Sequence, residues 1–304
     1  MKIAMTGATG FVGAETLRQA LDVGHRVTAL TRRPQPPRDG VTWAPGALDD
    51  AAALDTLVAG ADVVLHIAGV VNAPSRAAFE AGNGTGTANV IAAMQRAGVR
   101  RLVHVSSLAA REPELADYCW SKALAEEHVQ ASGLDWTIVR PPAVYGQGDT
   151  EFRELFRAAS KGVLPVPPQG RASLIQVTDL ARALLALCET ADPAHIGATY
   201  EVDDGTPGGL SHAELAAAFG RAMDRRVRPI PLPRWVLMSF AALDGLARGP
   251  AAKLTPDRVR YMCHTDWVAD PAKRPPAALW APQISTDAGL RMAAARYRTQ
   301  PRSS

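Results

Sequence analysis

A glycine-rich turn near the start of the chain constrains the fold more than any other feature. Lys2–Thr6 is a short apolar run typical of a buried strand, and Gly7-Ala8-Thr9-Gly10-Phe11-Val12-Gly13 leads from it into an amphipathic stretch. In such a turn the first glycine permits the tight bend, the second lets the backbone approach a pyrophosphate, and the third lets the helix lie close to the sheet. The order of strand, glycine turn and helix predicts a dinucleotide site, in preference to a glycine-rich loop without a ligand. The residues expected to contact the dinucleotide here are Gly7, Thr9, Gly10, Phe11 and Val12.

The first half of the chain alternates β-branched runs with alanine-rich stretches, which is typical of a parallel sheet covered by helices. The predicted strands are Lys2–Thr6, Arg26–Thr31, Val63–Ile67, Arg101–Ser106 and Trp136–Arg140. The predicted helices lie near Val12–Asp22, Leu54–Val58, Asn83–Ala97 and Tyr118–Ser132. The sequence therefore predicts an α/β fold, a Rossmann-type doubly wound parallel sheet.

After Arg140 the pattern changes, because prolines and glycines crowd a loop-rich stretch around one helical segment, Glu151–Ala159. Residues 174–177 and 199–202 are predicted as strands that return to the sheet, with a helix over 179–188. We therefore predict an NADP-binding domain of residues 1–145 and 174–202. A smaller, mostly helical C-terminal substrate-binding cap is predicted for residues 146–173 and 203–304, with a disordered polar tail at 299–304.

Composition narrows the class of protein. The 304 residues are 47% hydrophobic and carry a formal net charge of +3 from scattered arginines, which does not indicate nucleic-acid binding. Three cysteines, Cys119, Cys188 and Cys263, have no paired spacing, and the N-terminus shows no signal-peptide pattern. We expect a cytoplasmic location and no membrane span, and a homodimer is left open.

The most apolar stretch of the second half, Trp235–Leu246, lies between two prolines and has amphipathic spacing. Two interpretations compete: a helix packed in the core, which we favour, and a helix that lies on a membrane surface. The same segment could also line an apolar substrate pocket.

The nature of the dinucleotide is indicated by Thr31-Arg32-Arg33, about 20 residues beyond the glycine turn, where an NAD site carries an acidic side chain for the ribose hydroxyls. No carboxylate is present there. An arginine can pair with a 2′-phosphate instead, so NADP is favoured over NAD. Arg32 is the better candidate because it is closer to the strand end; the alternative is that both arginines only face solvent.

A tyrosine and a lysine, Tyr118 and Lys122, are spaced one helical turn apart and so share a helix face. A cation beside the phenol stabilises its anion, so the pKa of Tyr118 should fall from ~10 toward the range of a general acid or base. Beside a nicotinamide, this pair indicates redox chemistry on carbonyls and alcohols.

Six ordered motifs resemble the extended branch of the short-chain dehydrogenase/reductase superfamily, the NAD(P)-dependent epimerase/dehydratase-like proteins. The motifs are residues 6–13, Leu65-His66-Ile67-Ala68-Gly69, Asn83-Gly84-Thr85-Gly86-Thr87, Val105-Ser106-Ser107, Tyr118 with Lys122, and residues 140–146. The resemblance covers about the first 200 residues. It implies that Ala68 and Gly69 run beneath the cofactor and that Pro141 and Val144 flank the nicotinamide.

The resemblance also implies a catalytic triad of Ser107, Tyr118 and Lys122. In it the serine would donate a hydrogen bond to a substrate oxygen, the tyrosine would transfer the proton, and the lysine would hold the ribose and tune the tyrosine. Ser106 is the alternative to Ser107, which we favour.

Three departures from the family pattern bear on the ligands. Leu48, in Gly46-Ala47-Leu48, replaces the usual acid beside the adenine and offers only apolar contact. The interval from Ser107 to Tyr118 is short for a nucleotide-sugar epimerase. Ala143 takes the place of an asparagine that grips the diphosphate of nucleotide sugars, which disfavours a UDP-sugar substrate.

Other polar residues are expected to be structural. His66, at the end of a predicted buried strand, is expected to be packed against the cofactor loop. Cys119 points about 100° away from Tyr118 around the helix. The histidines show no metal-ligand spacing, so we expect no metal.

The leading hypothesis is an NADP-dependent oxidoreductase that exchanges hydride with a ketone or secondary alcohol of a hydrophobic small molecule. Apolar residues such as Trp120, Trp235 and Phe240 would suit that substrate. The alternatives are a nucleotide-sugar epimerase or dehydratase, and a non-catalytic NADP-binding sensor or assembly protein.

Overall fold

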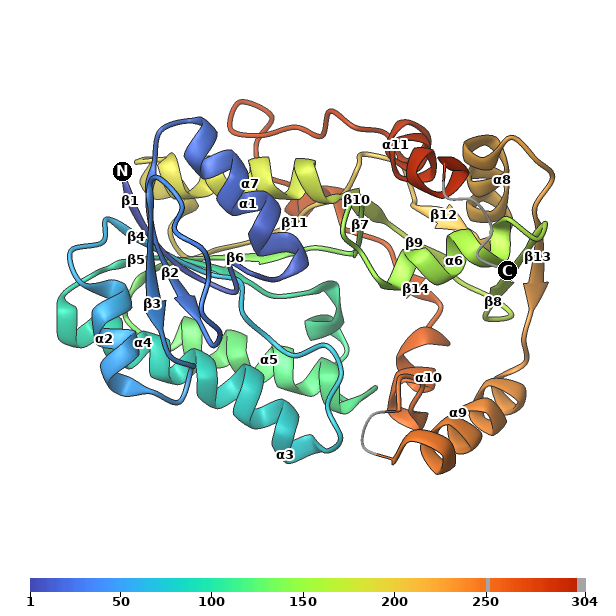
Figure 1. The fold of residues 1–304 in the computed structure, drawn as a ribbon, viewed down its shortest axis with the longest axis horizontal. Helices are drawn as coiled ribbons and strands as arrows, with labels where there is room; N and C mark the ends of the chain where they lie inside the picture. The colour runs from blue at the N-terminus through green and yellow to red at the C-terminus, as the bar shows by residue number, and fades with distance from the viewer. Residues whose placement is uncertain (250–251, 300–304) are drawn as a thin grey trace. The chain divides into compact units, whose positions relative to one another are not determined.

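The computed structural model describes residues 1–249 and 252–299, which form two compact units (Figure 1). Unit 1 comprises Met1–Pro141, Leu180–Val202 and Pro271–Ala281. Unit 2 comprises Pro142–Asp179, Asp203–Asp270 and the chain from Pro282 onward. Apart from Thr299, the tail predicted to be disordered lies outside the described residues.

Unit 1 is built on a seven-stranded parallel sheet with the order β11-β6-β5-β4-β1-β2-β3. Its strands are β1 (Lys2–Thr6), β2 (Arg26–Thr31), β3 (Val41–Pro45), β4 (Val63–His66), β5 (Arg101–Val105), β6 (Asp135–Arg140) and β11 (Ala198–Glu201). Every residue of β4 is buried, as its continuous apolar run requires in a parallel sheet covered on both faces. The predicted α/β class and doubly wound sheet are confirmed.

Helices cover both faces of this sheet, as Figure 1 shows. One face carries α1 (Phe11–Asp22) and most of α7 (Val177–Glu189), and the other carries α2 (Ala51–Val58), α4 (Gly86–Ala97) and α5 (Asp117–Gln130). A short helix, α3 (Arg76–Phe79), continues through a π-helical turn at Glu80–Thr85 into α4, and a 3-10 turn covers Leu108–Arg111.

The core of unit 1 lies between the sheet and its helices. Leu57 of α2, Met94 of α4 and Leu102 of β5 are all fully buried in one apolar cluster. Burying side chains of this size contributes about 1.5 to 3 kcal/mol each relative to exposure. The strands are therefore held rigidly enough to position the loops at their ends.

The strand order indicates where on the sheet a ligand is expected to bind. β1 pairs with β2 on one side and with β4 on the other, so the direction of winding reverses between β1 and β4. In sheets of this kind ligands bind outside the carboxyl ends of the strands at that switch point. The glycine turn after β1 and the loop after β4 both lie there.

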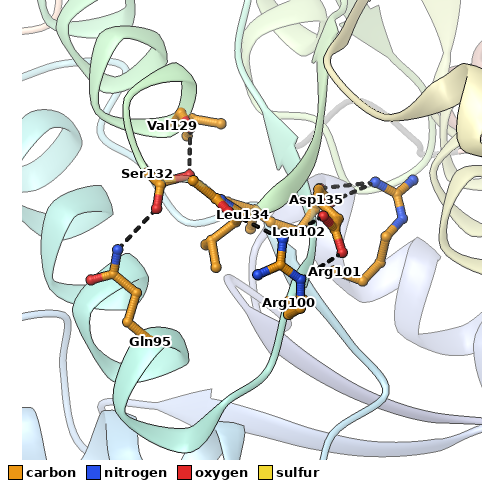
Figure 2. A network of polar contacts seen from close by, with 9 residues as sticks. Gln95, Arg100, Arg101, Leu102, Val129, Ser132, Leu134 and Asp135 are labelled. Carbon is orange, nitrogen blue, oxygen red and sulfur yellow. Dashed lines mark hydrogen bonds and ion pairs between the residues drawn. The ribbon is translucent and has the colours of Figure 1, made fainter.

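At the opposite end of the strands, polar side chains connect neighbouring elements of unit 1 (Figure 2). Arg100 forms a bidentate pair with Asp135, with nitrogen to oxygen distances of 2.8 and 3.0 Å. Arg101 donates to Thr137 Oγ1 at 2.8 Å and to the carbonyl oxygen of Leu187 at 2.7 Å. These contacts join β5, β6 and α7 and leave the carboxyl edge for ligands.

Unit 2 combines small sheets with several helices. Its strands are β7 (Ala143–Tyr145), β8 (Val163–Val166), β9 (Arg171–Ala172), β10 (Leu174–Gln176), β12 (Leu210–Ser211), β13 (Arg228–Pro231) and β14 (Asp266–Trp267). Its helices are α6 (Glu151–Ala159), α8 (His212–Met223), α9 (Arg234–Arg248), α10 (Pro256–Met262) and α11 (Thr286–Thr299). Aromatic rings form the core, with the rings of Phe156 and Phe219 edge to face at 4.8 Å.

Three details differ from the sequence prediction. β10 pairs with β7 in a separate two-stranded sheet, so of the segments expected to rejoin the main sheet only β11 does so. Pro271–Ala281 belongs to unit 1 and not to the cap, since Lys273 lies 3.6 Å from Glu201 and Arg182 donates to the carbonyl oxygen of Ala281. β3, which the sequence does not predict, is a short edge strand in which only Ala44 is buried.

The apolar stretch Trp235–Leu246 does form a helix, α9, but the preferred interpretation of a core-packed helix is wrong for most of its large side chains. Only Leu237 and Ala241 are buried, whereas Trp235, Phe240, Leu243 and Leu246 are exposed. The apolar residues surround more of the helix than α10, which packs against it, covers. Among the helices that the structure describes, none is both long enough and apolar enough to cross a bilayer.

Candidate active site

The candidate site is formed in unit 1, where β1, β4 and β5 end side by side. Thr6 at the end of β1 is in register with His66 at the end of β4, and His66 with His104 of β5. The three following loops are residues 7–10, 67–70 and 106–107, which contain six of the predicted site residues: Gly7, Thr9, Gly10, Ala68, Gly69 and Ser107.

The glycine turn has the geometry that its sequence predicts. Gly7 adopts a φ of +74°, and a Cβ there would lie 2.7 Å from the backbone nitrogen of Ala68. A Cβ on Gly13 would collide with the carbonyl oxygen of Gly7, so the first turn of α1 needs glycine to approach the loop. Both positions exclude larger residues for reasons of backbone packing.

Gly10 differs from the other two glycines because it faces open space. It is exposed, its N–H donates to the carbonyl oxygen of Gly7 at 2.9 Å, and a Cβ there would approach only that oxygen, at 3.3 Å. The first turn of α1, from Phe11, carries no acidic side chain. An exposed glycine before a helix N-terminus without competing acids fits the pyrophosphate of a dinucleotide.

His66 is held in one protonation state by a chain of buried hydrogen bonds. Thr6 Oγ1 accepts from the backbone N–H groups of Ile67 and Ala68, so its proton goes to Nδ1 of His66, 2.6 Å away. Nε2 of His66 then donates to Oγ1 of Thr87 at 3.0 Å. Burial, reinforced by the charge of Lys122, lowers the pKa of His66 to about 3. The neutral imidazole shapes the loop after β4.

Lys122 reaches the same edge from α5. Its ammonium nitrogen donates to the carbonyl oxygen of Val105, the last residue of β5, at 3.0 Å. The side chain is buried, and this burial lowers the pKa of Lys122 to about 8, while the carboxylate of Glu126 acts in the opposite direction. A Cβ on Gly69 would lie 3.8 Å from the same nitrogen, so the lysine abuts the loop after β4.

Tyr118 lies in the first turn of α5, one turn before Lys122. It is half-buried, and its ring centroid lies 6.0 Å from that of Phe79 at the end of α3. The helix therefore places the phenol and the ammonium on one face, with the phenol nearer to solvent. Trp120 follows, covered by the guanidinium of Arg76 at 3.7 Å.

Asn83, which the sequence prediction did not include among the site residues, ties the loop after β4 to α5. Its Oδ1 accepts from the N–H of Val70 at 2.7 Å, and its Nδ2 donates to the carbonyl oxygen of Val70 and to Oγ of Ser121. Ser121 in turn donates to the carbonyl oxygen of Tyr118 at 2.8 Å. The sequence signal that could have identified Asn83 is its position: it is a polar residue at the start of a predicted helix, in the Asn-Gly-Thr motif.

The two candidate serines follow β5 directly. The strand ends at Val105, so alternation along a regular strand does not assign their faces. Oγ of Ser107 accepts from the N–H of Ala109 at 3.2 Å and caps the 3-10 turn. Oγ of Ser106 is buried and has no hydrogen-bond partner among the described residues. Each hydroxyl keeps a proton to donate.

The residues predicted near the adenosine half lie at the ends of β2 and β3. Oγ1 of Thr31 donates to the carbonyl oxygen of Arg33 at 2.6 Å, and this turn leaves Arg32 exposed. Leu48 is half-buried against the core of unit 1, and its carbonyl oxygen accepts from Nδ2 of Asn89 at 2.8 Å.

The residues predicted beside the nicotinamide fall in different units. Pro141 ends the first segment of unit 1, where its carbonyl oxygen accepts from the N–H of Leu108 at 3.0 Å. Ala143 and Val144 belong to β7 of unit 2, in which Val144 is paired with Ile175 of β10. Across residues 1–249 and 252–299, no three His, Cys, Asp or Glu side chains are grouped so that they could hold a metal ion.

Comparison with known proteins gives consistent matches over this chain. Residues 7–190 match a family described as NAD(P)H-binding. A ceramide reductase of Caulobacter vibrioides is 37% identical over 280 residues, which cover 89% of this chain and 86% of that protein. A 2-alkyl-3-oxoalkanoate reductase of Stenotrophomonas maltophilia is 30% identical over 333 residues, covering 96% and 98%.

A solved structure of the human epimerase family protein SDR39U1 (isoform 2) with NADPH is similar with a TM-score of 0.75. The identity is 18%, and the match covers 97% of this chain and 99% of that one. This likeness concerns the fold alone.

Proposed function

The chain belongs to the extended branch of the short-chain dehydrogenase/reductase superfamily and is an NAD(P)-dependent oxidoreductase, and from this we propose that it is an NADP-dependent reductase of a hydrophobic carbonyl compound. Its reverse reaction is oxidation of the corresponding secondary alcohol. The observation that carries the proposal is the placement of Tyr118 and Lys122 on one face of α5, with Lys122 buried against the end of β5.

The glycine turn and the loop after β4 would hold the cofactor. The N-terminus of α1 favours the negative charge of a pyrophosphate. It is surrounded by Gly7, Thr9, Gly10, Phe11 and Val12. Ala68 and Gly69 would lie beneath the cofactor, with Leu48 against the adenine and Pro141 and Val144 at the nicotinamide. When bound, the reduced nicotinamide supplies the hydride for the carbonyl carbon.

The protein's own residues supply the proton and orient the carbonyl. Tyr118 donates its phenolic proton to the carbonyl oxygen as that oxygen gains charge, and the ammonium of Lys122 stabilises the tyrosinate that remains. Ser107 donates a hydrogen bond to the same oxygen; Ser106 is the alternative donor. Lys122 is suited to this position because burial weakens its hydration and lowers its pKa to about 8.

The preference for NADP rests on Arg32. Its guanidinium is exposed directly after β2, at the position where an acid would favour the 2′-hydroxyl of NAD. A guanidinium pairs well with a 2′-phosphate through charge-assisted hydrogen bonds.

The substrate class rests on the names of the relatives. One is called a reductase of ceramide and another a reductase of 2-alkyl-3-oxoalkanoate. A ketone on a long-chain or alkyl-substituted compound is therefore the proposed substrate class. Ala143 provides no amide for the diphosphate of a nucleotide sugar, which supports a reductase over an epimerase.

Purified protein incubated with NADPH and a panel of ketones tests the proposal. The panel combines long-chain 3-oxo lipids, 3-oxo acids, short polar ketones and a UDP-sugar. The expected result is oxidation of NADPH with the apolar ketones and none with the polar compounds. Tight NADPH binding without turnover on any ketone would overturn the reductase proposal and favour a sensor.

A further inference from the structure

The outer face of α9 is exposed and apolar. The exposed fractions are 72% for Trp235, 52% for Phe240, 60% for Leu243 and 86% for Leu246. With Ile230 of the preceding strand, these side chains are half of the large hydrophobic residues exposed in the described parts of the chain, within 17 residues. Exposed hydrophobic side chains concentrated in this way mark an interaction surface.

The helical pattern makes this face continuous. Successive residues advance by about 100°, so Trp235, Leu243 and Leu246 lie within about 80° of one another, and Phe240 lies beside Leu243. The hydroxyl of Ser239, which lies among them, donates to the carbonyl oxygen of Trp235 at 2.9 Å and is satisfied within the helix. The face therefore presents almost no unsatisfied polar group.

The inner face already has its contacts. Leu237 and Ala241 pack with Val259 of α10, and α9 lies beside α10 in Figure 1. The carboxylate of Asp244 accepts from the backbone N–H groups of Lys253 and Leu254 at 2.7 and 2.9 Å. The orientation of α9 is thus set by its inner side, which leaves its apolar side outward.

The stretch of sequence that contains α9 carries mostly positive charges. Residues 225–262 hold eight of the 33 lysines and arginines of the chain but only two of its 30 acidic residues. Both acids are engaged locally: Asp244 also pairs with Arg248 at 3.2 Å, and Asp257 pairs with Arg260 at 3.2 Å. Arg234 at the start of α9 and Lys253 after its end are exposed. An apolar helix face within a basic segment matches the interface of a membrane with anionic lipids.

We propose that α9 docks on the surface of an anionic lipid bilayer. Trp235, Phe240, Leu243 and Leu246 enter the boundary between headgroups and acyl chains, and Lys253, just after the helix, supplies a positive charge for the anionic headgroups. The helix has 15 residues and is about 22 Å long, so with one side held by α10 it lies in the plane of the interface.

A second copy of this chain is the competing occupant, and charge disfavours it. A two-fold contact through α9 would bring together the excess positive charge of this segment from both copies. The bilayer proposal does not depend on the proposed reductase activity, although a membrane-bound enzyme would meet lipid substrates directly.

The test uses the full chain and sedimentation with two kinds of vesicle. One is pure phosphatidylcholine and the other contains about 30% phosphatidylglycerol. The test variants are Leu243→Glu and Leu246→Glu, whose side chains are exposed and leave the core intact. Val23→Glu is the matched control, since Val23 is 61% exposed but lies at the end of α1 in unit 1.

The expected result is binding of the wild type and Val23→Glu to the anionic vesicles, weakened by salt, with at least a ~10-fold loss in Leu243→Glu and Leu246→Glu. Brominated acyl chains should quench wild-type tryptophan fluorescence more than that of Trp235→Phe. Thermal unfolding followed by circular dichroism shows whether each variant is folded.

Several outcomes would overturn the proposal. These are no binding of the wild type to anionic vesicles, equal binding to both kinds of vesicle, or equal binding by the two α9 variants. A lipid-free dimer that Leu246→Glu converts to a monomer, with no vesicle binding, would assign the face to a second copy. None of these outcomes depends on whether the protein reduces a ketone.

Discussion

The ammonium nitrogen of Lys122 lies 3.0 Å from the carbonyl oxygen of Val105, at the point where β5 ends and the two candidate serines begin. This contact joins α5, which carries Tyr118, to the carboxyl edge of the sheet. A cation with so little access to solvent is costly to bury, and such positions are common at functional sites.

Tyr118→Phe should remove most turnover and leave NADPH affinity within about twofold of the wild type. The substitution deletes the proposed proton donor and keeps the ring that packs near Phe79. Steady-state kinetics on the best ketone and a cofactor titration measure the two effects. A wild-type kcat in this variant would show that another group donates the proton.

Lys122 should make the stability of the protein depend on alkaline pH. The pKa of Lys122 is about 8 in the folded chain, against ~10.4 in an unfolded one. Between these pH values the unfolded chain binds more protons, so the free energy of unfolding rises as pH rises, by roughly 3 kcal/mol in total.

Lys122→Met removes this dependence, so we expect the variant to be the more stable protein near pH 7 and to lose that advantage near pH 10. It should also lose turnover. Urea unfolding followed by circular dichroism at several pH values measures the difference. If the difference in the free energy of unfolding between the variant and the wild type does not change with pH, the pKa of Lys122 is not lowered by burial.

Asn83→Ala should loosen the loop after β4. Both the N–H and the carbonyl oxygen of Val70 lose their partner, which destabilises the fold by about 2 kcal/mol. Hydrogen exchange at the Val70 amide should accelerate and NADPH affinity should fall several-fold. In the control, Asn89→Ala, the lost partner is Leu48, so the Val70 amide should remain protected. Unchanged exchange at Val70 in Asn83→Ala would mean that other contacts hold the loop.

Arg32→Asp should reverse the cofactor preference. Loss of a charge-assisted hydrogen bond and repulsion of the 2′-phosphate together weaken NADPH by roughly 2 to 4 kcal/mol, whereas NADH should bind as well or better. Arg33→Asp serves as the matched control and should have the smaller effect. Fluorescence titration with both nucleotides decides this. If the wild type binds NADH as tightly as NADPH, the NADP assignment is wrong.

Glu126→Ala should destabilise unit 1 by breaking a buried ion pair. The carboxylate of Glu126 forms a bidentate pair with Arg140 at 2.8 and 2.5 Å, and the variant leaves that largely buried guanidinium with the more distant carboxylate of Glu201, 3.7 Å away. We expect a loss of about 3 kcal/mol in the free energy of unfolding. Arg100→Ala, which breaks the exposed pair of Figure 2, should change it little. Equal effects of the two substitutions would contradict a stabilising role for the buried pair.

Local patterns determined the parts of the fold that depend on residues close together in the chain. β1, β2 and the turn at Gly7 lie where the sequence predicts them, because strand periodicity and the glycine requirement of a tight turn are local properties. The spacing of Tyr118 and Lys122 on one helix is local in the same sense.

The tertiary structure decided what depends on partners distant in the chain. β10 pairs with β7, Pro271–Ala281 joins unit 1 through Glu201 and Arg182, and Asn83 reaches Val70 and Ser121. An amphipathic pattern likewise shows that α9 is a helix but not how much of its circumference a neighbour covers. The sequence alone determined the dinucleotide fold and the spacing of Tyr118 and Lys122. The burial of Lys122 and the exposure of Trp235 and Leu246 were decided only by the tertiary structure. The reason is that the surroundings of a side chain are formed by segments that can be far away in the sequence.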